Sequence, residues 1–213
     1  MRQLYFKNLR LEMGMGGRFL VRLVIYVFYG MLTATMIVIL FAEMRWLQSL
    51  GFFLILFLGD RLLHLNRGDK KLAYLPAAGR VNLNAYLTPI TFSILERSFD
   101  QAFFIRGDFF LWLARQLLDQ SRVRKLLRKS GVKVKWHEAD KELQRLLADS
   151  RREKYKKAEL LTLTEQLVAA AATEALIING NYVNPEHLLL ALFKREPKAM
   201  KGISFLGSVK IKL

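Results

Sequence analysis

The hydrophobic pattern divides the chain into an apolar front and a longer region of mixed polarity. Residues 23–42 carry no charged side chain, and about twenty such residues at 1.5 Å per residue match the roughly 30 Å hydrocarbon core of a bilayer. A second apolar run, residues 47–59, is short for a transmembrane span and could instead lie at the membrane interface. It reaches spanning length if the helix extends from Trp46 to Leu63. We expect a two-helix transmembrane hairpin over residues 19–64. The long run and the lack of a small-residue cleavage site disfavour a secretory signal peptide.

Basic residues flank both ends of this hairpin but are scarce in its loop, which holds Arg45 alone. Because cytoplasmic flanks are enriched in Lys and Arg, the pattern places both ends in the cytoplasm. We therefore expect a multi-pass protein of the cell membrane with a basic N-terminal segment (residues 1–18) and a C-terminal domain, both cytoplasmic. Residues 65–83 contain Gly, Pro and charge without periodicity, which is typical of a linker.

From residue 84 onward, apolar residues recur at the three-and-four spacing of amphipathic helices. Thr88-Pro89 predicts a helix start, followed by an apolar stripe that includes Phe99, Ala102 and Phe103. Asp108 is expected to cap a helix over residues 109–118, and further helices are expected over 122–128 and 136–147. A long helix opens near Leu160, and another begins at Pro185, with Asn184 as its cap.

The helical region repeats itself. Gly131 corresponds to Gly207 and Ala114 to Ala191, at offsets of 76 and 77 residues. A period of this length, with several short helices in each unit, predicts an internal duplication. We assign the two units to residues 84–150 and 151–213.

The second unit carries a specific motif, Asn184-Pro185-Glu186-His187 followed by Leu-Leu-Leu-Ala-Leu, with Phe-Leu-Gly207 after a gap. This motif resembles the Clp repeat, the N-terminal helical domain of Clp-type AAA+ unfoldases. The first unit is similar in layout, with Phe109 and Phe110 where the Glu-His pair would stand. The resemblance covers residues 84–213, and we expect the last helix of the second repeat to be missing. It implies an all-α fold: two transmembrane helices, then a double Clp-repeat bundle with pseudo-twofold symmetry.

The composition limits the kinds of catalytic and metal-binding site that the chain can form. The chain has no Cys and three His, which excludes disulfides, thiolate metal sites and cysteine nucleophiles. No Walker A pattern is present, and Glu186-His187 lacks a third catalytic partner. We expect no catalytic residues, no cofactor and no metal. The resemblance implies that Glu186 and His187 fix helix ends and the packing between repeats.

The net charge of +16 is concentrated in residues 115–157, which contribute +9. This stretch could be a solvated helix face, a surface for anionic lipid or an acidic protein, or a nucleic-acid site. Interspersed acidic residues and the absence of a nucleic-acid motif disfavour nucleic acid. As partner-binding residues we select exposed basic and aromatic positions: Arg122, Arg124, Lys125, Arg128 and Trp136.

Three functions remain open from the sequence. The leading hypothesis is a membrane-anchored, non-catalytic protein-interaction module that docks adaptors or protein substrates for a protein-unfolding and proteolysis machine, as the resemblance implies. The second is the truncated N-terminal portion of a membrane-anchored Clp-type AAA+ ATPase, which would make the longer chain an enzyme. The third is a membrane-tethered nucleic-acid-binding protein. The lipid bilayer and a Clp-type unfoldase, adaptor or client are the expected partners, and the oligomeric state is left open.

Overall fold

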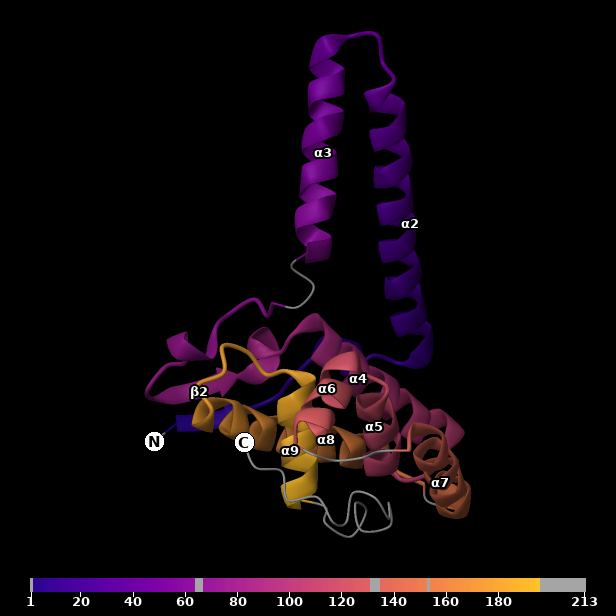
Figure 1. The fold of residues 1–213 in the computed structure, drawn as a ribbon, viewed down its shortest axis with the longest axis vertical. Coiled ribbons are helices and arrows are strands. Elements are labelled where there is room, and N and C mark those ends of the chain that lie inside the picture. The colour runs from indigo at the N-terminus through magenta and orange to yellow at the C-terminus, as the bar shows by residue number, and fades with distance from the viewer. Residues whose placement is uncertain (1, 64–66, 131–134, 153, 196–213) are drawn as a thin grey trace. The chain divides into compact units, whose positions relative to one another are not determined.

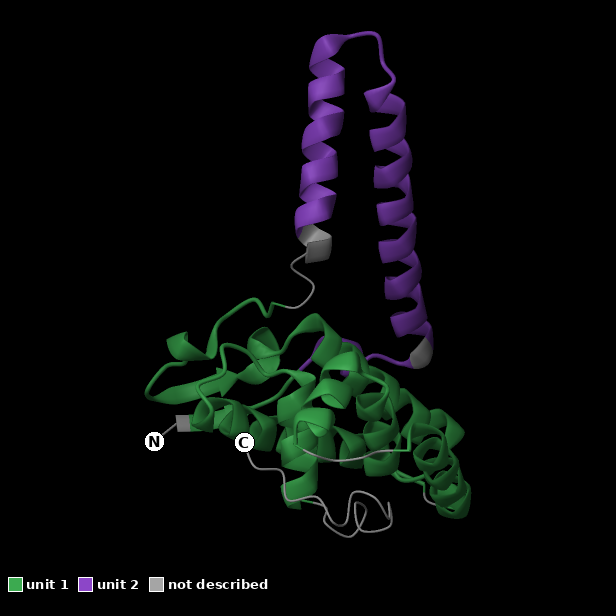
Figure 2. Ribbon diagram, viewed as in Figure 1, with its two compact units in different colours: residues 1–7, 67–213 green, residues 8–66 purple. Residues whose placement is uncertain are grey.

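The computed structural model describes residues 2–63, 67–130, 135–152 and 154–195 (Figure 1). The regular elements of these residues are helices apart from two short strands, so the all-α fold class is confirmed. The chain divides into two compact units, which Figure 2 shows in different colours. One is the hairpin unit, residues 8–66, and the other is the helical unit, which comprises residues 1–7 and 67–213.

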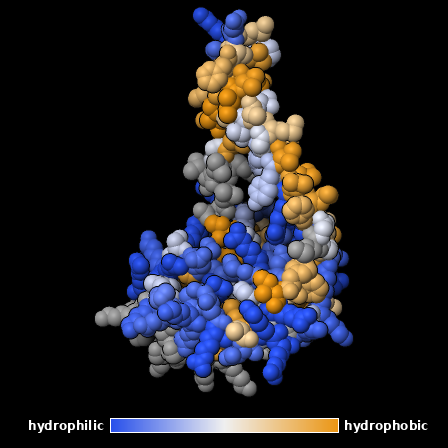
Figure 3. Space-filling view, turned by 90° about the vertical axis from the view of Figure 1, so that its right-hand side faces the viewer, coloured by the Kyte–Doolittle hydropathy of each residue, from blue (hydrophilic) through white to orange (hydrophobic). Residues whose placement is uncertain are grey.

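The hairpin unit consists of a short helix α1 (Leu9–Glu12) and two long helices, α2 (Met15–Leu40) and α3 (Arg45–Leu63). The long helices run antiparallel along each other (Figure 1), and their side chains are mostly apolar (Figure 3). At Gly51 a Cβ atom would lie 3.1 Å from Cγ of Leu40. The absence of a side chain at Gly51 therefore allows α3 to approach α2 closely.

Two helical stretches among the described residues are long and apolar enough to cross a membrane. Gly16–Leu40 has a mean hydropathy of 2.3 and none of its most apolar window is buried. Lys157–Ile177 has a mean hydropathy of 1.3, and 44% of its window is buried, as in the core helix of a folded domain. Length and composition thus agree with the first expected span. The stretch containing α3 does not meet this criterion over the described residues, and the second span stays a prediction.

The N-terminus and the expected linker contribute strands that the pattern did not reveal. Strand β1 (Arg2–Tyr5) pairs in parallel with β2 (Gly79–Asn82), placing Arg2 opposite Gly79. Asn82 extends the pairing, since its amide nitrogen donates to the Lys7 carbonyl at 2.9 Å. The basic segment 1–18 is therefore not one element: its start belongs to the helical unit, and α2 already begins at Met15. Pairing satisfies backbone groups of both segments.

The expected linker, residues 65–83, is also partly structured. It contains the 3₁₀ turn η2 (Leu72–Tyr74) and leads into η3 (Leu83–Tyr86), and both Leu72 and Leu83 are buried. The Leu72 N–H donates to the carbonyl of Asn181 at 2.7 Å. These contacts attach the segment to the loop before the last described helix, so it packs as part of the helical unit.

Over its described residues, the helical unit contains six α-helices: α4 (Pro89–Asp100), α5 (Phe109–Leu118), α6 (Ser121–Lys129), α7 (Trp136–Asp149), α8 (Lys157–Ile177) and α9 (Pro185–Arg195). The predicted caps of α4 and α5 are confirmed, because Thr88 Oγ1 accepts the Thr91 N–H at 3.4 Å and Asp108 Oδ1 accepts the Leu111 N–H at 2.9 Å. A 3₁₀ turn η5 (Ser150–Arg152) follows α7.

The helices form two pairs, α4 with α5 and α8 with α9, and the pairs pack against each other. Fully buried side chains such as Phe99, Phe109 and Leu167 lie in the shared core. An isolated parallel bridge links Leu87, before α4, to Val183, before α9. The division into two repeat units, residues 84–150 and 151–213, stays a prediction. The expected Phe-Leu-Gly207 helix, and Gly131 and Gly207 themselves, lie outside the described residues.

One prediction about α4 is wrong. The helix continues as a π-helical turn, η4 (Gln101–Ile105), so the apolar stripe does not extend regularly through it. Ala102 is buried, but Phe103 is exposed. A π turn adds a residue to the helical repeat and shifts the positions that follow away from the original face.

Candidate functional site

A pocket of about 660 Å³ opens between α5, α6 and α7 of the helical unit. Its lining combines an aromatic ring, two arginines, two aspartates and apolar side chains, with Gln101 of η4 at one side. The lining residues are Gln101, Arg115, Gln116, Leu118, Asp119, Arg124, Trp136, His137, Ala139, Asp140 and Leu143. These helices are held in the helical unit by other side chains, because Leu117, Val123, Leu127 and Leu147 are buried in the core.

Arg124 joins the helices on either side of the pocket. Its guanidinium carbon lies 5.0 Å from the centre of the Trp136 ring, within the range of a cation–π contact. Its Nη2 donates to Asp119 Oδ1 at 2.9 Å, and its Nε donates to the Leu118 carbonyl at 2.9 Å. These contacts hold the guanidinium at the end of α5 and fix it against the first residue of α7.

Arg115 forms a second connection across the same pocket. Its Nε lies 3.3 Å from Asp140 Oδ1, which links α5 to α7. Gln144 donates to the other carboxylate oxygen of Asp140 at 2.9 Å. The pocket therefore pairs each of its arginines with a carboxylate, and it also contains the half-buried Trp136 ring. Such a surface suits a polypeptide segment that carries both polar and apolar groups.

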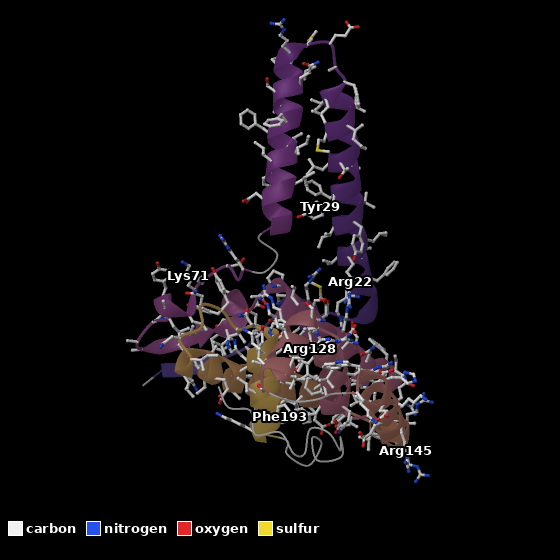
Figure 4. The ribbon with its side chains drawn as sticks, viewed as in Figure 1. Arg22, Tyr29, Lys71, Arg128, Arg145 and Phe193 are labelled. Carbon is white, nitrogen blue, oxygen red and sulfur yellow. The ribbon has the colours of Figure 1, made fainter. Side chains whose placement is uncertain are left out.

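The structure places only part of the sequence-selected set in this pocket. Arg124 and Trp136 line it, whereas Arg122, Lys125 and Arg128 are exposed on α6 and do not. Figure 4 labels Arg128 within the helical unit. Sequence reasoning missed Arg115, Asp119 and Asp140. An acidic residue following α5 by one position was the available signal for Asp119, but nothing in the sequence paired Arg115 with Asp140 on another helix.

The Asn184–His187 motif fixes the start of α9. His187 is buried, and its Nδ1 accepts the backbone N–H of Asn184 at 2.9 Å. Pro185 opens the helix and Glu186 lies in its first turn. Burial lowers the pKa of His187 below its ordinary value of 6.5, against the raising effects of Glu186, a Tyr182 backbone hydrogen bond and Glu174. A neutral imidazole that accepts a backbone N–H is a helix cap, as the resemblance implied.

A second interaction holds α9 to α8. Glu174 is almost fully buried on α8, and each of its carboxylate oxygens lies 2.7 Å from Lys194 Nζ. Close to the other end of α9, a Cβ atom at Gly180 would lie 3.0 Å from His187 Cε1. The second helix pair is thus locked at both ends of α9. Over the described residues, no group of three or more His, Cys, Asp or Glu side chains is placed to hold a metal ion.

Residues 110–203 match the family model of the Clp repeat (R) N-terminal domain. No curated protein and no solved structure matches the chain. The matched segment runs from α5 to beyond α9, so it contains the Asn184–His187 motif and nearly all of the pocket lining. It excludes α4, which the resemblance over residues 84–213 had included, and the hairpin unit, which that resemblance did not cover. Residues 110–203 are therefore similar to the Clp repeat N-terminal domain.

Proposed function

We propose that this chain is a membrane-anchored, non-catalytic protein-interaction module that docks adaptors or protein substrates for a Clp-type protein-unfolding and proteolysis machine. The observation that carries the proposal is the match of residues 110–203, since the matched segment encloses the pocket of Arg124 and Trp136. A module of this type binds protein segments. The pocket is a surface of the module that combines a concave shape with polar and aromatic contacts.

The composition of the pocket supports a polypeptide ligand. Arginine and tryptophan are enriched among the residues that contribute most to protein–protein binding. Arg124 is held by Asp119 and the Leu118 carbonyl before any partner binds. A fixed guanidinium loses little conformational freedom on binding, which favours affinity. The incoming segment would place an apolar side chain on Trp136 and a carboxylate or backbone carbonyl near Arg115 or Arg124.

The hairpin unit supplies the anchor in this proposal. The apolar stretch Gly16–Leu40 is unburied and long enough to span a bilayer. With α3 as a second span, the basic flanks would place the N-terminus and the helical unit together in the cytoplasm. This arrangement also agrees with the pairing of β1 and β2, because the two strands that border the hairpin in the sequence must then lie on one side of the membrane.

Site-specific labelling tests the anchor. The chain has no Cys, so Met44→Cys in the hairpin loop and Lys71→Cys after the hairpin can each be labelled alone. In intact cells, a membrane-impermeant maleimide should label residue 44 and reach residue 71 only after lysis. Labelling of both positions, or of neither, in intact cells would contradict the two-span topology.

Photo-crosslinking tests the docking role. A benzoylphenylalanine at Trp136 should crosslink to Clp-type ATPase subunits, to their adaptors, or to proteins that are subsequently degraded. The matched control is the same group at Arg145, which is exposed on α7 outside the pocket (Figure 4). Identical adducts from both positions would contradict a docking pocket. ATP hydrolysis above background by the purified chain would contradict a non-catalytic role.

A further inference from the structure

The end of η4 exposes three consecutive apolar side chains, Phe103, Phe104 and Ile105, here called the aromatic tip. Their exposed fractions are 36%, 40% and 53%. Phe104 packs edge-on against Phe103, with ring centres 4.9 Å apart, and Phe103 stacks on the buried Phe99. The tip is therefore supported from the core while its apolar surface is presented outward. Large exposed apolar groups that are held in place in this way mark an interaction surface.

The backbone at the aromatic tip is strained. Arg106 has φ 70° and ψ 172°, a region that residues other than glycine seldom occupy. The conformation is maintained because Trp112 Nε1 donates to the Arg106 carbonyl at 3.0 Å. Gly107, with φ 105°, then turns the chain into α5. A π-helical turn followed by a strained residue recurs at functional sites, and here both features serve to expose the same three side chains.

A basic segment lies next to the aromatic tip. The Asp108 N–H donates to Ser150 Oγ at 3.0 Å, which places the start of α5 against η5. A Cβ atom at Gly107 would also lie 3.1 Å from Ser150 Oγ. The residues that follow Ser150 include four exposed cations, here called the basic segment: Arg151, Arg152, Lys154 and Lys156. Arg106 adds a further exposed cation at the tip itself.

We propose that the aromatic tip and the basic segment together form a peripheral binding site for a bilayer that contains anionic lipid. Aromatic and aliphatic side chains partition into the interfacial region, while neighbouring Lys and Arg residues are attracted to acidic headgroups. A single partner should account for both features. An acidic protein would use the cations but would not require the exposed Phe-Phe-Ile, and a purely apolar partner would use the aromatic tip but would not require the cations.

This proposal rests on the proposed membrane anchor, which would keep the helical unit close to a bilayer. The unit is tied to the hairpin at two points, before Asn8 and after Asn66. Two covalent tethers make contact with the membrane surface an intramolecular event, so a site of low intrinsic affinity can remain occupied. Docking of the tip would fix the orientation of the helical unit relative to the bilayer.

Spin labelling of the full chain in nanodiscs tests the site, and the absence of native Cys allows single labels. A nitroxide at Phe104→Cys should show a severalfold higher ratio of oxygen to nickel-chelate accessibility in discs with phosphatidylglycerol than in discs of phosphatidylcholine alone. A label at the exposed Thr173 of α8 should not change. A label at Phe28, on the exposed face of α2, reports the anchor separately.

The outcomes separate the two proposals. A Phe28 label in the aqueous phase would overturn the anchor, whereas a lipid-facing Phe28 label with a water-exposed residue 104 in both kinds of disc would overturn the peripheral site alone. The double change Arg151→Glu and Arg152→Glu should return residue 104 to water. The matched change Arg122→Glu and Lys125→Glu on α6 should not. Protection of residue 104 only by added polyglutamate would assign the tip to an acidic protein and overturn the lipid site.

Discussion

The guanidinium of Arg124 and the indole of Trp136 face each other at 5.0 Å across the candidate pocket. Arg124 belongs to α6 and Trp136 begins α7, so the contact joins two helices. It has two consequences. It ties the helices together, and it places a cation and an aromatic face at the same point in the pocket. The first affects stability and the second affects binding.

The two consequences can be separated by substitution. Arg124→Gln and Trp136→Leu should each lower the free energy of unfolding slightly, and their double-mutant cycle should give a coupling of about 0.5–1 kcal/mol. Both should greatly reduce crosslinking of partners from a photoreactive group at His137, another pocket residue. Arg122→Gln on the same helix is the control and should alter neither quantity. Equal loss of crosslinking with Arg122→Gln would assign partner binding to general positive charge.

Local signals predicted the helices well because they act over a few residues. Asp108 caps α5 as expected, and α5 spans the predicted residues 109–118. The missed features depend on distant partners. Strand β1 exists through its pairing of Arg2 with Gly79, and no short-range pattern indicates such a pair. The π-helical turn at 101–105 was missed as well, because apolar spacing does not distinguish it from a continuing α-helix.

The residues of the candidate site could likewise be predicted from the sequence only in part. Exposed basic residues on α6 are visible in an amphipathic pattern, so Arg124 could be selected together with Arg122, Lys125 and Arg128. Which of them faces the pocket is decided by the packing of α6 on the core, and only Arg124 does. The link between Arg115 and Asp140 joins different helices, and helical periodicity carries no information about it.

The ion pair of Glu174 with Lys194 should contribute measurably to stability. Lys194→Met leaves a buried carboxylate without its cation, which we expect to lower the free energy of unfolding by about 1–3 kcal/mol. Lys135→Met is the matched control, because Lys135 and Glu138 form a pair in which both side chains are largely exposed. That change should cost at most about 1 kcal/mol. Denaturant unfolding of the full chain in detergent measures both, and equal effects would show that burial of Glu174 is unimportant.

The stability of the helical unit should fall below neutral pH through His187. Burial lowers the pKa of this imidazole in the folded chain below 6.5, so the unfolded chain binds the proton more readily. Stability present above pH 6.5 is therefore lost as the pH falls from 6.5 toward the lowered value, by up to about 1.4 kcal/mol per pH unit. His187→Gln should flatten this part of the profile. His137→Gln on the exposed surface of α7 should leave it unchanged, and an unaltered profile in His187→Gln would refute the assignment.

The close approach of the two long helices should depend on Gly51. A side chain there would meet Leu40 at 3.1 Å and Ile39 at 3.3 Å, whereas a Cβ at Gly59 on the same helix meets nothing within 4 Å. Gly51→Leu should therefore push α3 away from α2, because an overpacked contact is relieved by backbone movement. Spin labels at Val38 and Phe53, both largely exposed, would report the spacing by pulsed electron resonance. The distance should increase in Gly51→Leu and stay unchanged in Gly59→Leu, and equal distances in the two variants would mean that Gly51 does not set the separation of the helices.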